Sequence, residues 1–274
     1  MAGWLRVEAP PPPIHKPALE KEALRDVIDL SLWAGQLLLQ YGADSARIEE
    51  TVHRLGTGLG ADWMDILVSP NAIAVTTSSG IEFRTKIRRV VAIQVNMQII
   101  AEVNDVRHRV TTGELDRVGV RREFERIDHL TRQYPRWLVA IMVGLACAAF
   151  SRLFGGDWPA FIITFAAGAL AMRLRQILAH NYFNPLLIVV ATAFAAGMIG
   201  SLATTTGWSA EPQAALAASV LLLVPGVQLI NAAQDLIRGH LVTGIVRGVT
   251  GGLVSLGIAL GLVLALRLMG LGGL

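Results

Sequence analysis

A stripe of polar and ionisable side chains interrupts an apolar segment in the C-terminal part of the chain. Its members are spaced by three, four and three residues, which places them on one face of a helix: Gln228, Asn231, Asp235 and Arg238. Pro225 and Gly226 stand just before the stripe and break the helical pattern. In lipid, ionisable side chains and unpaired backbone groups are costly unless they line a cavity or meet a partner. The pattern therefore predicts a substrate or translocation site.

The charged members of this region have two interpretations each. Asp235 suits a proton or substrate site, because a carboxyl within a membrane segment is rare and commonly functional. It equally suits an intrahelical pair with Arg238, three residues later. Arg247, near the start of the next helix, suits an anionic substrate or the cationic anchoring of a helix end.

The uncharged residues of this region also have two interpretations each. Pro225 and Gly226 suit a broken helix that turns backbone amides toward an anionic substrate, or a proline kink that neighbouring helices satisfy. Gln228 and Asn231 suit hydrogen bonds to a substrate carboxylate or amine, or hydrogen bonds between helices. All of these positions are kept as candidates for substrate binding or translocation.

The half of the chain that carries the stripe is predicted to be a membrane domain. Residues 137–274 contain six Lys or Arg and three Asp or Glu, whereas residues 1–136 contain 18 of each kind. Five apolar segments there approach the ~20 residues that cross a bilayer. They lie at about 137–154, 158–172, 184–203, 214–230 and 241–268, and the short second one is expected to extend past Arg173 and Arg175 by snorkelling.

The placement of basic residues predicts the orientation of these spans. Six of them fall on one side of the predicted membrane: Arg132, Arg136, Arg173, Arg175, Arg238 and Arg247. Basic residues gather on the cytoplasmic side. We therefore expect a multi-pass protein of the bacterial inner (plasma) membrane, with the N-terminus in the cytoplasm and the C-terminus outside.

The last predicted span is rich in glycine. Gly244, Gly248 and Gly252 recur every four residues. Small residues at this spacing let two helices approach closely. We predict that these glycines serve helix packing, and a direct role in the transport pathway is the alternative.

The first half is predicted to hold a compact α+β domain over residues 19–136, after a disordered, Pro-rich tail over residues 1–18. Apolar residues at helical spacing predict helices at about 19–40, 45–59, 92–110 and 120–133. Between the second and third, alternating patterns predict strands at about 66–68, 72–77 and 81–87. Arg84, Lys86, Arg88 and Arg89 predict a basic strand edge that faces lipid headgroups, an anionic ligand or a second subunit.

Several function classes find no support in the sequence. G-x-S-x-G, P-loop and H-E-x-x-H patterns are absent, so no catalytic residue, nucleotide site or metal site is predicted. The net charge of +3 comes with interleaved acids, which does not indicate nucleic-acid binding. A single cysteine, Cys147, lies in an apolar run and rules out an intrachain disulfide.

Four segments resemble the threonine/serine exporter family. They are GADSARIEETVHRLGTGLG (residues 42–60), VSPNAIAVTT (68–77), FRTKIRRV (83–90) and PGVQLINAAQDLIRGHLVTGIVR (225–247). The resemblance covers nearly the whole chain after residue 18. It implies transport across a membrane, and it leaves threonine/serine and succinate open as substrates, since the fused form is associated with the first and the split form with the second.

The resemblance also implies a partner. Full-length members of the family join two membrane halves, and this chain is similar to the larger subunit of the split form, whose smaller partner is a separate membrane protein. An odd number of spans likewise favours a partner half or an oligomer. We expect a secondary exporter without a cofactor, with the proton gradient as its energy source. The alternative is a membrane-anchored enzyme, such as a hydrolase, or a metabolite sensor that acts through residues 19–136.

Overall fold

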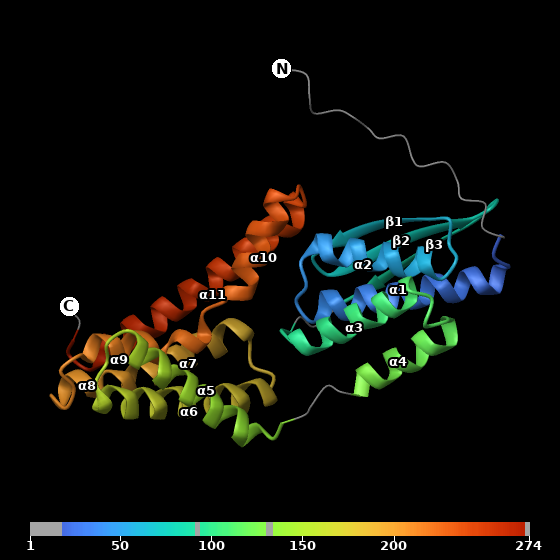
Figure 1. Ribbon diagram of the computed structural model, residues 1–274. Helices are drawn as coiled ribbons and strands as arrows, with labels where there is room; N and C mark the ends of the chain where they lie inside the picture. Colours follow the sequence, from blue (N-terminus) through green and yellow to red (C-terminus); the bar gives the residue numbers. More distant parts are fainter. Residues whose placement is uncertain (1–17, 91–93, 130–133, 272–274) are drawn as a thin grey trace, which may run out of the picture. The chain divides into compact units, whose positions relative to one another are not determined.

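The computed structural model describes residues 18–90, 94–129 and 134–271. The chain is mostly helical, with one three-stranded sheet near the N-terminus (Figure 1). It divides into two compact units. The first contains the described residues up to 129 together with Gln234–Thr243, and the second contains residues 134–233 and those from 244 onward. Nearly all of the predicted N-terminal tail lies outside the described residues.

Four helices and the sheet build most of the first unit. The helices are α1 (Lys21–Gln40), α2 (Ser45–Gly58), α3 (Met97–Thr111) and α4 (Arg117–His129). Helix α1 is buried on most of its surface and lies at the centre of the apolar core. Gly42 has a φ of 92°, which allows the tight turn between α1 and α2. The helical spacing of the sequence is thus confirmed, with boundaries shifted by a few residues.

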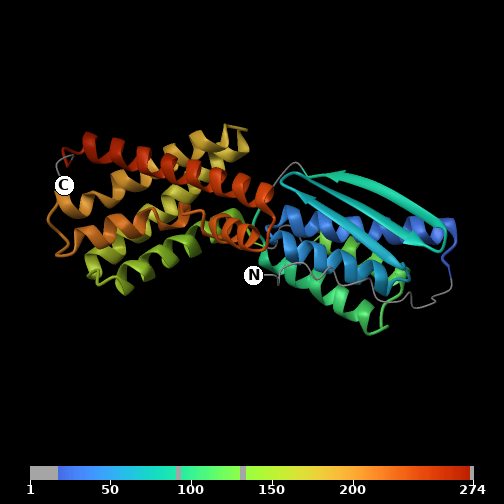
Figure 2. The same cartoon turned by 90° about the horizontal axis from the view of Figure 1, so that it is seen from above.

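The sheet is an antiparallel meander of β1 (Trp63–Ser69), β2 (Ala72–Ser79) and β3 (Glu82–Arg89). Ala74 stands opposite Leu67 on one side and Ile87 on the other. Gly80, with a φ of 56°, forms the second turn, and its N–H donates to the Asp62 carboxylate at 2.7 Å. In Figure 2, α1 and α2 lie along one face of this sheet.

Strand β3 turns its charged side chains toward those helices. Lys86 binds Asp29 of α1, and Arg88 Nη1 donates to the Gln36 side chain at 3.0 Å. The apolar side chains of Phe83 and Ile87 lie on the opposite face and are each 73% exposed. The alternation is confirmed. The predicted basic edge is wrong for Lys86 and Arg88, because polar groups of α1 pair with them. For Arg84 and Arg89 it stays a prediction.

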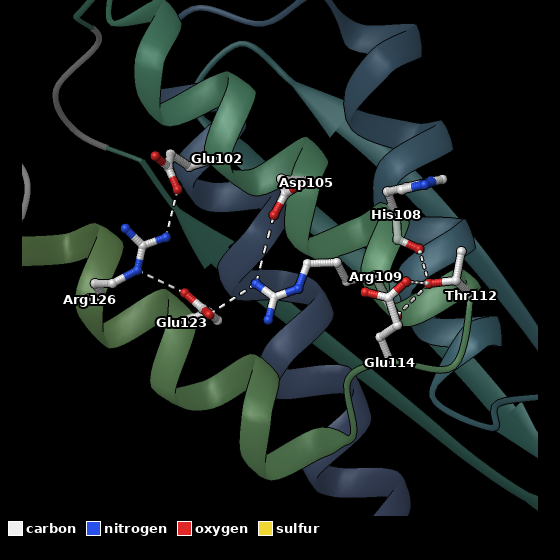
Figure 3. A network of polar contacts seen from close by, with 8 residues as sticks. All are labelled: Glu102, Asp105, His108, Arg109, Thr112, Glu114, Glu123 and Arg126. Atoms are coloured by element: carbon white, nitrogen blue, oxygen red, sulfur yellow. Dashed lines mark hydrogen bonds and ion pairs between the residues drawn. The ribbon is translucent and has the colours of Figure 1, made fainter.

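Helix α4 is attached to α3 by a chain of ion pairs (Figure 3). Glu123 accepts hydrogen bonds from Arg109 at 3.0 Å and from Arg126 at 2.8 Å. Arg126 also donates to Glu102 at 2.6 Å. The hydrogen bonds from Arg126, and then those from Arg109, hold the pKa of Glu123 below its usual range. The network therefore stabilises the unit most when Glu123 is ionised.

The second unit contains the apolar helices. They are α5 (Arg136–Leu153), α6 (Trp158–His180), α7 (Pro185–Gly200), α8 (Leu202–Thr205), α9 (Pro212–Ser219), a 3-10 turn (Leu221–Leu223), the first part of α10 (Gly226–Ile237) and α11 (Leu241–Leu268) from Gly244 onward. Among the described residues, four segments are long and apolar enough to cross a membrane. A fifth span is counted if the bent pair around residue 225 crosses as one. As predicted, α6 continues past Arg173 and Arg175.

Glycine allows two close helix crossings in this unit. At Gly144 of α5 an added Cβ would lie 2.8 Å from the carbonyl oxygen of Phe165 in α6. At Gly261 of α11 it would lie 2.4 Å from the carbonyl oxygen of Val190 in α7. Both distances are below van der Waals contact, so only glycine fits without backbone movement.

Candidate functional site

The helix is broken where the sequence predicts it. The 3-10 turn ends at Leu223, Val224 has an extended conformation (φ −58°, ψ 124°), and α10 begins at Gly226. The helices on the two sides of the break are bent by 64°. Proline lacks an N–H and disfavours a helical conformation at the preceding residue, which explains the break. An added Cβ on Gly226 would meet nothing within 4 Å, so helix packing does not require glycine there.

Helix α10 exposes large apolar residues, whereas the first three members of its polar stripe are half-buried or buried and Arg238 is exposed. Gln228 and Asn231 are half-buried, and Asp235 is fully buried. Four large apolar residues are exposed: Leu229, Ile230, Leu236 and Ile237. This is the reverse of a helix at a water-exposed surface and fits a helix with lipid around it. The side-chain oxygen of Gln228 is buried and has no hydrogen-bond partner among the described residues.

Asp235 meets the N-terminus of α2 within the first unit. Its carboxylate accepts a hydrogen bond from the backbone N–H of Ser45 at 2.9 Å, and both residues are fully buried. The first amides of a helix have no intrahelical partner, and the helix dipole favours negative charge beside them. An ionised Asp235 is therefore well placed to cap α2.

A second carboxylate serves the same helix end. Asp44 is the N-cap residue of α2 and accepts a hydrogen bond from the Arg47 N–H at 3.1 Å. Arg238, one turn beyond Asp235, donates to Asp44 at 3.0 Å. The two charged members of the stripe thus reach neighbouring positions at the start of α2.

The turn after α10 brings a third ionisable residue to α2. Gly239 has a φ of 89°, and the His240 N–H donates to the Asp235 carbonyl oxygen at 2.8 Å, which ends the helix. The His240 side chain then lies 3.5 Å from the Glu49 carboxylate. Burial raises the pKa of Glu49; His240 opposes this shift and the negative charge of Asp235 adds to it. Thr243 extends the contact by donating to the Val68 carbonyl oxygen at 3.4 Å.

Glu49 also lines a cavity between α2 and β1. The cavity has a volume of about 340 Å³ and is lined by Glu49, Glu50, His53, Arg54 and residues 64–66. His53 Nδ1 donates to the Met64 carbonyl oxygen at 3.2 Å. No Ser, Thr or Cys is among these lining residues, so they supply no hydroxyl or thiol nucleophile. Across residues 18–90, 94–129 and 134–271, no group of three His, Cys, Asp or Glu could hold a metal ion.

The remaining candidates lie on α11. Arg247 is half-buried. Gly244 is buried, and an added Cβ on Gly248 would lie 3.8 Å from Ala232. At Gly252 it would meet nothing within 4 Å, whereas at Gly251 it would lie 2.7 Å from a methyl group of Leu229. The packing role of the predicted glycine row stays a prediction.

Sequence reasoning missed the partners of the stripe. Asp44 was recognisable as an N-cap residue, but nothing in the spacing joins it to Arg238, 194 positions away. Glu49 likewise gives no signal of a contact with His240. Such pairs follow from the tertiary fold, and periodicity within one element cannot reveal them.

Comparisons with known proteins identify the family of this chain. A family model with the description "Putative threonine/serine exporter" matches residues 29–269. The chain belongs to this family. The "Probable succinate transporter subunit YjjP" of Escherichia coli (strain K12) is 41% identical over 256 residues, which cover 93% of this chain and 99% of that protein. The protein of the same name from Klebsiella aerogenes is 39% identical over 255 residues, covering 93% and 98%.

A more distant relative is longer than this chain. The "Probable threonine/serine exporter" of Mycobacterium tuberculosis is 24% identical over 250 residues, which cover 89% of this chain and 46% of that protein. No solved structure matches the chain. Family membership confirms the resemblance of the four sequence segments. Together with the apolar helices it identifies a multi-pass membrane protein of an exporter family.

Proposed function

We propose that this chain is one subunit of a secondary exporter for small carboxylated metabolites and works with a smaller membrane subunit. The observation that carries the proposal is the break at Pro225 and Gly226, followed by polar residues that are half-buried or buried, in a member of an exporter family. The buried, unpartnered oxygen of Gln228 supports it, because a polar substrate or water in a pathway would satisfy such a group.

The favoured substrate is a dicarboxylate such as succinate. The two relatives that match over almost their whole length, at 41% and 39% identity, carry the name of a succinate transporter subunit. That word "subunit" also supports a partner chain. The threonine/serine exporter from Mycobacterium tuberculosis is only 24% identical. Arg247 is our candidate for the cation that meets a substrate carboxylate.

We place the protein in the bacterial inner membrane, with the first unit and the N-terminus in the cytoplasm and the C-terminus outside. The distribution of Lys and Arg supports this orientation. The proton gradient is the proposed energy source, and ionisable groups at the end of α10 could accept the proton. Labelling of cysteines introduced near each terminus with a membrane-impermeant reagent tests the orientation.

The function is tested by efflux. Cells that express the smaller subunit are preloaded with labelled succinate, threonine or serine, and efflux is measured with and without this chain. Loss of succinate efflux alone supports the dicarboxylate assignment. Loss of threonine and serine efflux instead assigns the amino acids as substrates, and unchanged efflux of all three contradicts an exporter function.

A further inference from the structure

Three titratable groups from two distant parts of the sequence meet at the start of α2. Asp235 is bound to the Ser45 N–H, and His240 lies 3.5 Å from Glu49, one turn further along α2. Asp235 and His240 both act electrostatically on Glu49, in opposite directions. Both contributing segments belong to the first unit, so the cluster is internal to it.

We propose that Glu49, Asp235 and His240 form the site that takes up the coupling proton, with Glu49 as the carboxyl that changes its protonation state. This inference rests on the proposed proton-coupled exporter. The proposed proton site thus lies between α2 and the segment Gln234–Thr243, and not on the stripe of α10 alone. In this cluster Asp235 positions and tunes Glu49.

The carboxylates of Asp235 and Glu49 have different surroundings. Asp235 is fully buried, and its carboxylate accepts a hydrogen bond from a backbone amide at the N-terminus of α2. Glu49 is partly buried and lies within electrostatic range of Asp235, so its ionisation adds a second negative charge that Asp235 disfavours. Burial and this repulsion raise the pKa of Glu49, against the opposing effect of His240.

The other charged groups around Glu49 already have partners. On α2, Arg54 is paired with Glu50 at 2.9 Å, and from α3 Arg107 approaches the same carboxylate at 3.8 Å. Arg238, on the segment that carries Asp235, donates to Asp44. From β1, Asp65 lines the same cavity as Glu49 and adds negative charge, and His53 donates to a carbonyl oxygen. His240 is thus the nearest balancing group in the described part of the chain.

The cavity between α2 and β1 gives the proton a route. Glu49 is one of its lining residues, so water can reach the carboxyl from the side of the first unit. A proton that reaches the site is shared between the Glu49 carboxylate and His240 Nδ1, which lie 3.5 Å apart, and it can leave through this cavity. Protonation of Glu49 removes its repulsion of Asp235 and strengthens the hydrogen bond that Asp235 accepts from the Ser45 N–H. Deprotonation weakens the hold of α2 on the segment Gln234–Thr243.

Infrared spectroscopy of the purified full chain tests the site directly, because a protonated carboxyl has its own C=O absorption. The spectrum is followed from about pH 3 to about pH 8, a range that includes the ordinary glutamate pKa of about 4.3. Wild type should show a carboxyl that loses its proton at higher pH than an ordinary glutamate. Glu49→Gln should abolish that signal, and the control Glu125→Gln, at an exposed glutamate outside the cavity, should keep it.

Two further variants test the coupling within the cluster. Asp235→Asn keeps an oxygen acceptor for Ser45 but removes the repelling charge, so the titration of Glu49 should move to lower pH. His240→Gln removes the balancing group, so the titration of Glu49 should move to higher pH. Absence of the signal in wild type, its survival in Glu49→Gln, or shifts in the same direction would overturn the proposal.

A transport measurement separates this inference from the proposed function. The chain and its smaller subunit are placed in vesicles, and succinate efflux is measured with and without an imposed pH gradient. We expect Glu49→Gln to lose the stimulation by the gradient and Glu125→Gln to retain it. Equal stimulation of wild type and Glu49→Gln overturns the proton site alone. If wild type moves no substrate, the exporter function fails, and the infrared titration still decides the protonation of Glu49.

Discussion

Asp235 accepts a hydrogen bond from the backbone N–H of Ser45, across 190 positions of the sequence. The contact makes the C-terminal end of α10 part of the first unit, together with the following turn. A buried carboxylate that was a candidate for substrate binding thus also has a capping role at α2. Both roles can be separated by experiment, because the capping role predicts a local change in α2.

Asp235→Ala should loosen the start of α2. The variant leaves a buried amide without its acceptor, which costs about 1–3 kcal/mol. Hydrogen–deuterium exchange of the full chain should therefore be faster by about tenfold or more in the first turn of α2. Asp235→Asn, which retains an acceptor oxygen, should show a smaller effect. Unchanged exchange in Asp235→Ala would contradict the capping role.

The ion pair between Asp44 and Arg238 should add little to the free energy of unfolding, compared with the N-cap hydrogen bond of Asp44. Arg238 is 53% exposed, so a double-mutant cycle with alanine at both positions should give a coupling of about 0.2–1 kcal/mol. Asp44→Ala alone should cost about 1 kcal/mol, because the Arg47 N–H loses its N-cap acceptor. Denaturant unfolding of the chain in detergent measures these differences. A larger cost for Arg238→Ala than for Asp44→Ala would contradict this ranking.

Gln228→Leu should separate stability from transport. The Gln228 oxygen is buried without a partner among the described residues, so leucine should leave stability unchanged or raise it. If Gln228 binds substrate, efflux should fall by about tenfold, which corresponds to one hydrogen bond of ~1.4 kcal/mol. Gln234→Leu, on the same helix and also half-buried, is the matched control. Equal efflux in the two variants would remove Gln228 from the pathway.

Periodicity predicted elements well and contacts between elements poorly. The bounds of α11, residues 241–268, follow from composition alone, because an apolar segment in lipid has few other solutions. The break at Pro225 follows from proline chemistry. In β3, however, the sequence predicted that charged and apolar side chains alternate, but not which set faces the helices. Lys86 and Arg88 face them because Asp29 and Gln36 of α1 pair with these side chains, and such pairs are not visible in the sequence of β3.

The ion-pair network between α3 and α4 should give the protein an acid-sensitive element. The pKa of Glu123 is lowered in the folded state, so its contribution is present above about pH 4.3 and is lost as pH falls through the folded-state pKa. Glu123→Gln should lower the melting temperature near neutral pH and should flatten its dependence on acid. The two proteins should converge at the lowest pH, whereas exposed Glu125→Gln should follow wild type. Parallel curves for wild type and Glu123→Gln would contradict the assigned role.

Two glycines of α11 should respond in opposite ways to alanine. At Gly261 the new Cβ would lie 2.4 Å from the Val190 carbonyl oxygen and 2.8 Å from the Ala193 Cβ, so α7 and α11 would have to move apart. Such overpacking costs about 1–3 kcal/mol. At Gly252 the Cβ meets open space, and alanine favours a helix over glycine by up to ~1 kcal/mol. Thermal melting in detergent should therefore show a loss for Gly261→Ala and no loss for Gly252→Ala. Equal melting temperatures would mean that the contact between α7 and α11 is looser than these distances require.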